Sequence, residues 1–220
     1  MKEATEATHI ESRWQVVLVI LAIFLLLTLL PNRVRVFPNW VPLLITIALI
    51  VPMAALQLIT PKARWLGVER IALLFFLSIA GFALVKSLAY LLYEMVRRSF
   101  EVTGIQLLAS SVAAWATNVL LFSLVYWRLD RGGPEARANH VNTKPDWLFP
   151  QQSVPEYVPP DWHATFIDYL CLAFVTATAF SPTDVLPLTS RAKMLMMLES
   201  IVSLVTIIAV AARAINILGS

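Results

Sequence analysis

Few residues in this 220-residue chain are of the types that do chemistry, and two of them lie inside long apolar runs. Lys86 and Glu199 each interrupt a stretch long enough to cross a membrane. A charge at that depth is costly, so an ionisable residue there is a candidate functional site. For Lys86 a structural role is the alternative, because its long side chain can reach the interface or pair within a helix bundle.

The remaining reactive side chains do not follow the pattern of an enzyme. Asp168, Asp184 and the three histidines form, with Lys86 and Glu199, neither a nucleophile–base spacing nor a metal-ligand spacing. The single cysteine, Cys171, cannot form an internal disulfide and is expected to be a small, buried packing residue. We therefore expect no catalytic residue, no metal site and no cofactor.

The composition is that of an integral membrane protein. The chain is 59% hydrophobic and 14% charged, its mean hydropathy is +0.74, and soluble domains carry about a quarter charged residues. The apolar residues form runs of membrane-spanning length. The formal charge of +3 comes from basic residues that flank these runs, so the expected partner is a lipid bilayer and not a nucleic acid.

The apolar runs predict an all-α membrane protein with five transmembrane helices and one shorter helix. The expected spans are residues 14–30, 40–60, 71–95, 104–127 and 194–218. Residues 1–13 form a polar tail, and residues 14–103 hold the first three spans. Residues 129–163 are rich in proline and aromatic residues, which predicts an irregular, partly ordered cap on one membrane face.

The shorter helix lies in the stretch from Phe166 to Pro187. Its apolar part ends near Phe180 and reaches about 22 Å at about 1.5 Å per residue, which is short of a bilayer core of about 30 Å. A polar turn with two prolines and another long apolar run follow. This order suggests a re-entrant element, in which protein or water must cover the non-helical backbone. If the short helix crosses instead, the chain has six spans.

The residues on both sides of this turn match a known sequence pattern of a short helix, a filter and a longer helix. Those on the pore-helix pattern are Phe166, Asp168, Phe174, Val175, Thr176 and Thr178. Asp184 and Pro187 then match an Asp and a Pro that follow a filter, Leu198-Glu199 the start of an inner helix, and Ala212-Arg213 its end. In this order the chain resembles the pore region of the tetrameric potassium-channel superfamily, the two-transmembrane or pore-loop ion channels.

The resemblance implies an architecture for residues 104–220, a pore-domain-like module. It assigns an outer helix to the fourth span, a turret-like loop to 129–163, a pore helix to 165–180, a filter-like turn to 179–187 and an inner helix to 194–218. It also implies a homotetramer around a central pore for monovalent cations, in the cell membrane. The first three spans carry no motif of this family.

The centre of the stretch departs from the family pattern. Where the family has Thr-Val-Gly-Tyr-Gly, this chain has Ala179, Phe180, Ser181, Pro182 and Thr183. The glycines allow backbone conformations that aim successive carbonyls at the ions. Pro182 fixes its own φ, and β-branched Thr183 does not suit positive φ. The departure predicts weak or no potassium selectivity.

The resemblance leaves other chemistry at the turn. It implies that the partly negative end of the pore helix favours cations and that a ring of Asp184 carboxylates concentrates them. The hydroxyls that could contact partly hydrated ions belong to Thr176, Thr178, Ser181 and Thr183. Asp184 could instead cap the turn locally, and a Phe180 facing the axis would form an apolar constriction.

Glu199 has two interpretations. The resemblance favours a structural hydrogen bond to the pore-helix backbone, and the alternative is a position on an aqueous path. Two functions remain open for the whole protein. The first is a cation pore with weak or no potassium selectivity, which the pore-helix pattern favours. The second is a non-conducting, channel-derived structural or interaction protein, which the filter substitutions favour.

Overall fold

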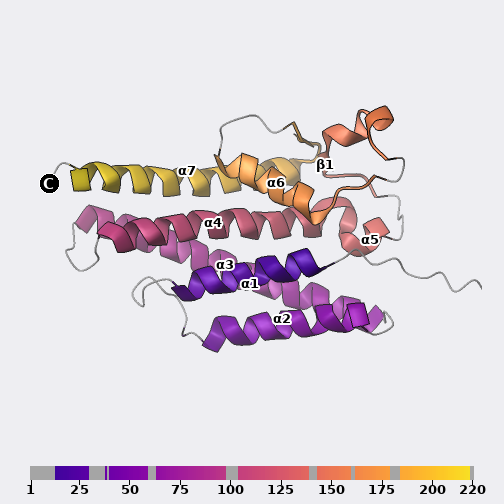
Figure 1. Ribbon diagram of the computed structural model, residues 1–220, viewed down its shortest axis with the longest axis horizontal. Coiled ribbons are helices and arrows are strands. Elements are labelled where there is room, and N and C mark those ends of the chain that lie inside the picture. The colour runs from indigo at the N-terminus through magenta and orange to yellow at the C-terminus, as the bar shows by residue number, and fades with distance from the viewer. Residues whose placement is uncertain are drawn as a thin grey trace, which may run out of the picture.

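Helices dominate the computed structural model, which describes residues 13–29, 38, 40–58, 63–97, 104–138, 143–159, 162–178 and 184–218. The long helices are α1 (Trp14–Leu29), α2 (Trp40–Leu58), α3 (Ala63–Arg97), α4 (Gly104–Leu129) and α7 (Ser190–Leu218), and the shorter ones are α5 (Pro134–Ala138) and α6 (Phe166–Thr178). The long helices lie side by side along the longest axis of the molecule (Figure 1). The prediction of a predominantly helical protein is confirmed.

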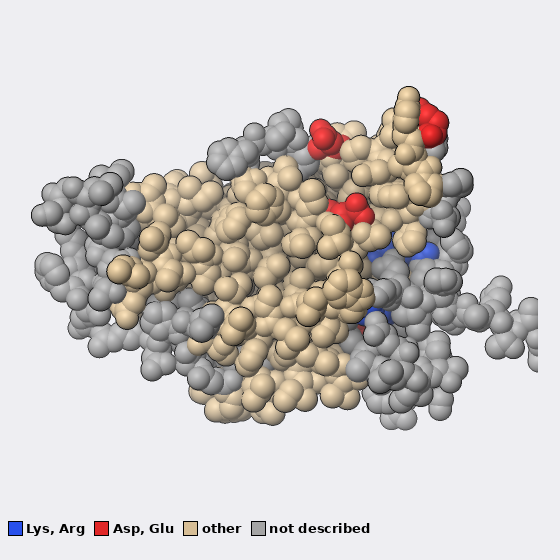
Figure 2. Space-filling model, in the orientation of Figure 1, with Lys and Arg blue, Asp and Glu red and all other residues tan. Residues whose placement is uncertain are grey.

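Three of the described helices are long and apolar enough to cross a membrane. Their candidate spans are Gly67–Tyr93 in α3, Leu108–Gly132, which includes most of α4, and Ser190–Ala211 in α7. The apolar helices Trp14–Thr28 and Phe166–Thr178 are shorter. Figure 2 shows that the described charged residues on this face lie toward the end of the molecule that carries α5 and β1. These features support the prediction of a membrane protein.

Two helices start earlier than the apolar runs suggest. The apolar run of the last helix starts at Met194, but α7 begins at Ser190 because Thr189 caps it: the Ala192 N–H donates to Thr189 Oγ1 at 3.2 Å. Likewise α3 begins at Ala63, before the apolar run at Ile71. Apolar runs mark the part of a helix that suits lipid, whereas caps and helix-forming polar residues set the ends of the helix.

The helix α4 is the scaffold of the fold. It packs against α1, α3, α6 and α7. Small or hydroxylated side chains such as Ser110, Ala114 and Thr117 are buried along it, and side chains of this size let helix backbones approach closely in membranes. Toward its end the buried residues become large, with Tyr126 and Trp127. The helix α4 therefore presents small side chains to its neighbours along its first part and large aromatic side chains near its end.

Residues 130–138 and 143–159 form a cap beyond the end of α4. The cap contains η1 (Asp130–Gly132), α5, β1 (Trp147–Leu148), η2 (Pro150–Gln152) and η3 (Pro155–Tyr157). Its strand β1 pairs antiparallel with β2 (Leu186–Pro187), with Trp147 opposite Pro187 and Leu148 opposite Leu186. Buried aromatic side chains attach the cap to the helices: the ring of Trp147 lies 4.8 Å from that of Tyr126, and Phe149 meets Tyr169 edge-on at 5.4 Å.

The turn into the cap requires glycine at one position. Gly133 has φ of 101° and ψ of 176°, a conformation that is almost exclusive to glycine. A Cβ there would lie 2.2 Å from Arg128 Nη1 and 3.0 Å from the Arg128 carbonyl oxygen. Arg128 pairs with Glu135 of α5 at 2.7 Å, so the displaced guanidinium would also lose this partner.

Gly133→Ala is therefore expected to lower the free energy of unfolding by about 1–3 kcal/mol. The matched control is Gly67→Ala in α3, where a Cβ meets nothing within 4 Å and helix propensity predicts a gain of about 0.5–1 kcal/mol. Thermal unfolding of both variants in detergent measures the difference. Equal melting temperatures for the two variants would contradict the conformational argument.

Candidate functional site

The short helix α6 reaches only part of the way along α7. It begins beside the end of α4, where the rings of Phe166 and Trp127 meet at 6.3 Å. At its other end the Thr176 carbonyl accepts a hydrogen bond from Ser200 Oγ at 3.4 Å, and the Ala177 carbonyl accepts one from Ser203 Oγ. Ser203 lies about 20 Å from the start of α7 at 1.5 Å per residue. The end of α6 thus lies against the middle of α7.

The start of α7 returns to the end of α4. Arg191 Nη2 donates to the Leu129 carbonyl oxygen at 3.3 Å, and Leu129 is the last residue of α4. The beginnings of α6 and α7 consequently lie at the same end of α4, as Figure 1 shows. The Asp168 carboxylate fixes the start of α6 there, because its Oδ2 accepts from the Thr165 N–H at 2.7 Å and from the Thr165 hydroxyl at 2.8 Å.

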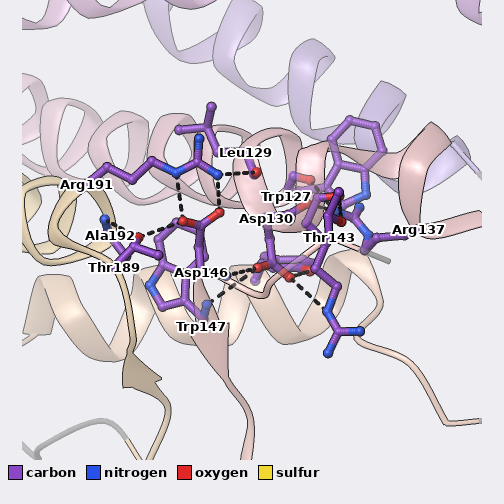
Figure 3. Close-up of polar contacts among 12 residues, drawn as sticks. Trp127, Leu129, Asp130, Arg137, Thr143, Asp146, Trp147, Thr189, Arg191 and Ala192 are labelled. Carbon is purple, nitrogen blue, oxygen red and sulfur yellow. Dashed lines mark hydrogen bonds and ion pairs between the residues drawn. The ribbon is translucent and has the colours of Figure 1, made fainter. Parts of the chain in front are cut away.

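Two buried carboxylates hold this end of the molecule together (Figure 3). Asp130, at the end of α4, is 1% exposed. Its Oδ1 accepts from the backbone N–H groups of Asp146 at 2.8 Å and of Trp147 at 3.4 Å. Its Oδ2 accepts from the Tyr169 hydroxyl of α6 at 2.7 Å. One side chain therefore connects α4, the cap and α6.

The second carboxylate, Asp146, connects the cap to the start of α7. It is also 1% exposed. Its Oδ1 accepts from Thr189 Oγ1 at 2.6 Å and from Arg191 Nε at 2.7 Å, and its Oδ2 pairs with Arg191 Nη2. The Leu188 N–H donates to the Asp146 carbonyl at 2.8 Å. With the β1–β2 pair, these bonds fix the chain between β2 and α7.

A third polar group lies deeper, between α4 and α7. The Glu199 side chain is fully buried, and its Oε2 accepts a hydrogen bond from the hydroxyl of Tyr126. Asn118 Nδ2 donates to the backbone carbonyl of Glu199 at 3.2 Å. Glu199 is thus a hydrogen-bond partner of α4, whereas the resemblance implied a bond to the backbone of the short helix, α6. That backbone is bonded by Ser200 and Ser203 instead.

The structure places only some of the predicted filter-like residues. Thr176 is buried and donates to the Leu172 carbonyl at 2.8 Å. Thr178 is half-buried and donates to the Phe174 carbonyl at 3.0 Å, while Asp184 is exposed. The other predicted positions lie outside the described residues; they are Ala179, Phe180, Ser181, Pro182 and Thr183.

The two charged residues predicted to lie at membrane depth, Lys86 and Glu199, are in different environments. Lys86 is exposed on α3, whereas Glu199 is buried against α4, so they do not form one site. The prediction of a buried Cys171 is wrong, because this thiol is exposed. It borders an apolar groove of about 430 Å³ between α4 and α6, in which the rings of Trp115 and Phe174 meet at 5.8 Å.

Sequence reasoning did not find Asp130, Asp146, Arg191 or Tyr126. Asp130 and Asp146 stand in a polar region where an acidic residue is ordinary, and an aromatic residue at the end of a span suggests an interface anchor. The hydrogen-bond partners of the Asp130 carboxylate are 16 to 39 residues away in the chain. The one sequence signal that pointed toward Tyr126 was Glu199, because a carboxylate within an apolar run requires a hydrogen-bond partner on a neighbouring helix.

Comparison of the chain with protein-family models, with curated proteins and with solved structures found no match.

Proposed function

We propose that this chain is the subunit of a homotetrameric, ion-channel-like protein of the cell membrane that forms a cation pore with weak or no potassium selectivity. The observation that carries the proposal is the path of α6 and α7. The short helix starts beside Trp127 at the end of α4, ends against Ser203 in the middle of α7, and α7 begins again beside Leu129. In a re-entrant element the short helix enters the membrane and the chain after it returns to the same face, which gives such a path.

The end of α6 and the turn that follows it carry groups that favour cations. The C-terminal end of α6 carries the partly negative end of the helix dipole into the protein, and Ser200 and Ser203 hold this end in position. Asp184 follows it and is exposed, so a ring of four such carboxylates would attract cations to the pore mouth. The substitutions at residues 179–183 support low selectivity.

The remaining helices complete the proposed arrangement. In it α1, α2, α3, α4 and α7 cross the membrane, and α6 does not. One face of α7 turns large apolar side chains away from the rest of the chain; the exposed ones are Met194, Met197, Leu198, Ile201, Leu204, Ile207 and Ile208. In a tetramer this face would meet the pore axis and the neighbouring subunits, which is why we propose a homotetramer.

Ion flux into liposomes tests the proposal. The full-length protein is reconstituted with an ion-sensitive dye inside, and potassium and sodium gradients are applied. The wild type is expected to pass both ions at similar rates. Asp184→Asn is expected to slow the flux several-fold at low salt and less at high salt, because salt screens an exposed charge. Phe180→Ala tests for an apolar constriction, and relief of one would raise the flux.

The control is Glu156→Gln, which removes a carboxylate from an exposed position in the cap and is expected to leave the flux unchanged. Absence of flux at every voltage and pH, in a preparation that remains folded, would refute the proposal of a cation pore. The alternative would then hold: a channel-derived membrane protein that does not conduct and serves as a structural or interaction partner.

A further inference from the structure

Two buried oxygen atoms between α4 and α7 have no hydrogen-bond donor. Glu199 and Asn118 are both 0% exposed. Glu199 Oε2 accepts from Tyr126, but Glu199 Oε1 has no hydrogen-bond partner, and neither has Asn118 Oδ1. Buried polar atoms are rarely left in this condition, because each loses its bonds to water without replacement. Both atoms are acceptors, so what the pair lacks is a hydrogen.

The amide of Asn118 is oriented by a bond of its own. Its Nδ2 donates to the backbone carbonyl oxygen of Glu199 at 3.2 Å. Reversing the amide would place Oδ1 against that carbonyl, acceptor against acceptor, so the hydrogen-bond network itself fixes the orientation. The free amide oxygen therefore belongs to a group that is already held at the backbone of Glu199.

Among the described side chains, the elements packed against this part of α7 supply no cation for the carboxylate. On α4, Tyr126 faces Glu199 and Arg128 pairs with Glu135. On α6, Asp168 bonds Thr165, Tyr169 bonds Asp130, and Cys171 is exposed. On α3, Glu69 pairs with Arg13. The other titratable groups of α3 with described side chains are Arg70, Lys86 and Tyr93, which are exposed, and Tyr90, which is half-buried. Within the described residues Glu199 has no ion pair.

A charged carboxylate without a counter-ion in such a place is very costly, and proteins avoid it by neutralising the group. A metal ion is a poor candidate, because the described residues contain no group of three His, Cys, Asp or Glu side chains that could hold one. Hard cations also need about six oxygen ligands. A single proton on Oε1 would instead turn one of the two acceptors into a donor.

We infer that the pair formed by Glu199 and Asn118 is a proton-binding site: a proton resides on Glu199 Oε1 and is donated to Asn118 Oδ1, which joins α7 to α4. In this arrangement one proton would satisfy both of the atoms that lack a partner. Removing the proton at alkaline pH places a negative charge in the protein interior and weakens the contact between the two helices. This inference is independent of conduction and holds for a pore and for a non-conducting protein alike.

Infrared spectroscopy of the full-length protein in lipid tests the proton directly. The wild type at neutral pH is expected to show the carbonyl band of a protonated carboxylic acid, and Glu199→Gln is expected to lack it. Asp184→Asn, which alters an exposed carboxylate, is the matched control and retains the band. Asn118→Leu removes the acceptor and shifts the band. Identical spectra of the wild type and Glu199→Gln in this region overturn the inference.

A pH series of melting temperatures provides the second readout. Glutamine is uncharged like the neutral acid, so Glu199→Gln should match the stability of the wild type at neutral pH. Raising the pH should then lower the melting temperature of the wild type by at least about 2–4 °C more than that of the variant. A Glu199→Gln protein that is much less stable at neutral pH, or a wild-type stability that follows sodium or potassium concentration and not pH, overturns the inference.

Discussion

Replacing Asp130 with alanine is expected to lower the free energy of unfolding by roughly 3–5 kcal/mol, because three donors lose their acceptor in a buried site. These donors are the backbone N–H groups of Asp146 and Trp147 and the hydroxyl of Tyr169. For a chain of this length the change corresponds to a fall in melting temperature of at least about 6 °C. Thermal unfolding of the purified protein in detergent measures it.

Two milder variants separate the hydrogen bonds of Asp130 from its volume. Asp130→Asn keeps an oxygen for the two backbone N–H groups, and Tyr169→Phe removes the hydroxyl by which α6 bonds Asp130; each is expected to cost about 1–2 kcal/mol. The control is Asp184→Ala at an exposed position, where the change should stay within about 0.5 kcal/mol. If Asp130→Ala behaves like Asp184→Ala, the carboxylate does not organise this end of the protein.

Replacing Arg191 with methionine is expected to lower the free energy of unfolding by about 2–3 kcal/mol, because Asp146 would stay buried with its charge and without its cation. Breaking a fully buried pair costs about 3–5 kcal/mol. Here the value is smaller because Arg191 itself is 56% exposed and part of the interaction is screened by solvent. Amide hydrogen exchange at Leu188, whose N–H is bonded to Asp146, should accelerate together with the loss of stability.

The neighbouring Lys193 provides the control for Arg191, since it is exposed and Lys193→Met removes the same charge two residues away. Its effect should lie within about 0.5 kcal/mol. A double-mutant cycle with Asp146→Asn measures the pair itself. Strict additivity of Arg191→Met and Asp146→Asn, with no interaction energy between them, would show that the two side chains are not coupled.

The sequence predicts α6 well because its signal is local. An apolar run too short to cross a membrane, followed by proline, distinguishes it from the spans on either side. The starts of α3 and α7 are not predicted by the apolar runs, because polar residues such as Arg64 and Ser190 extend these helices beyond the part that suits lipid.

The site is predicted less well because its bonds join distant parts of the chain. Asp146 meets Thr189 and Arg191 across 43 and 45 residues, and no spacing in the sequence encodes that distance. Glu199 differs from these residues, since its position in an apolar run already predicts a hydrogen-bond partner. The sequence does not identify that partner as Tyr126 of α4. Cys171 shows the opposite error: a small apolar type suggests burial, yet its place on α6 exposes it.

The side of α7 that faces its own chain affects how the protein can be made. The hydrogen-bonding groups that meet Glu199 and Ser203 belong to Tyr126, Asn118 and Ala177, and all three precede α7 in the chain. The 73 residues between Tyr126 and Glu199 require roughly 4–15 s of synthesis at about 5–20 residues per second. When the ribosome completes α7, the groups that bond its polar side are therefore already synthesised, and α7 can pack onto α4 as soon as it is made.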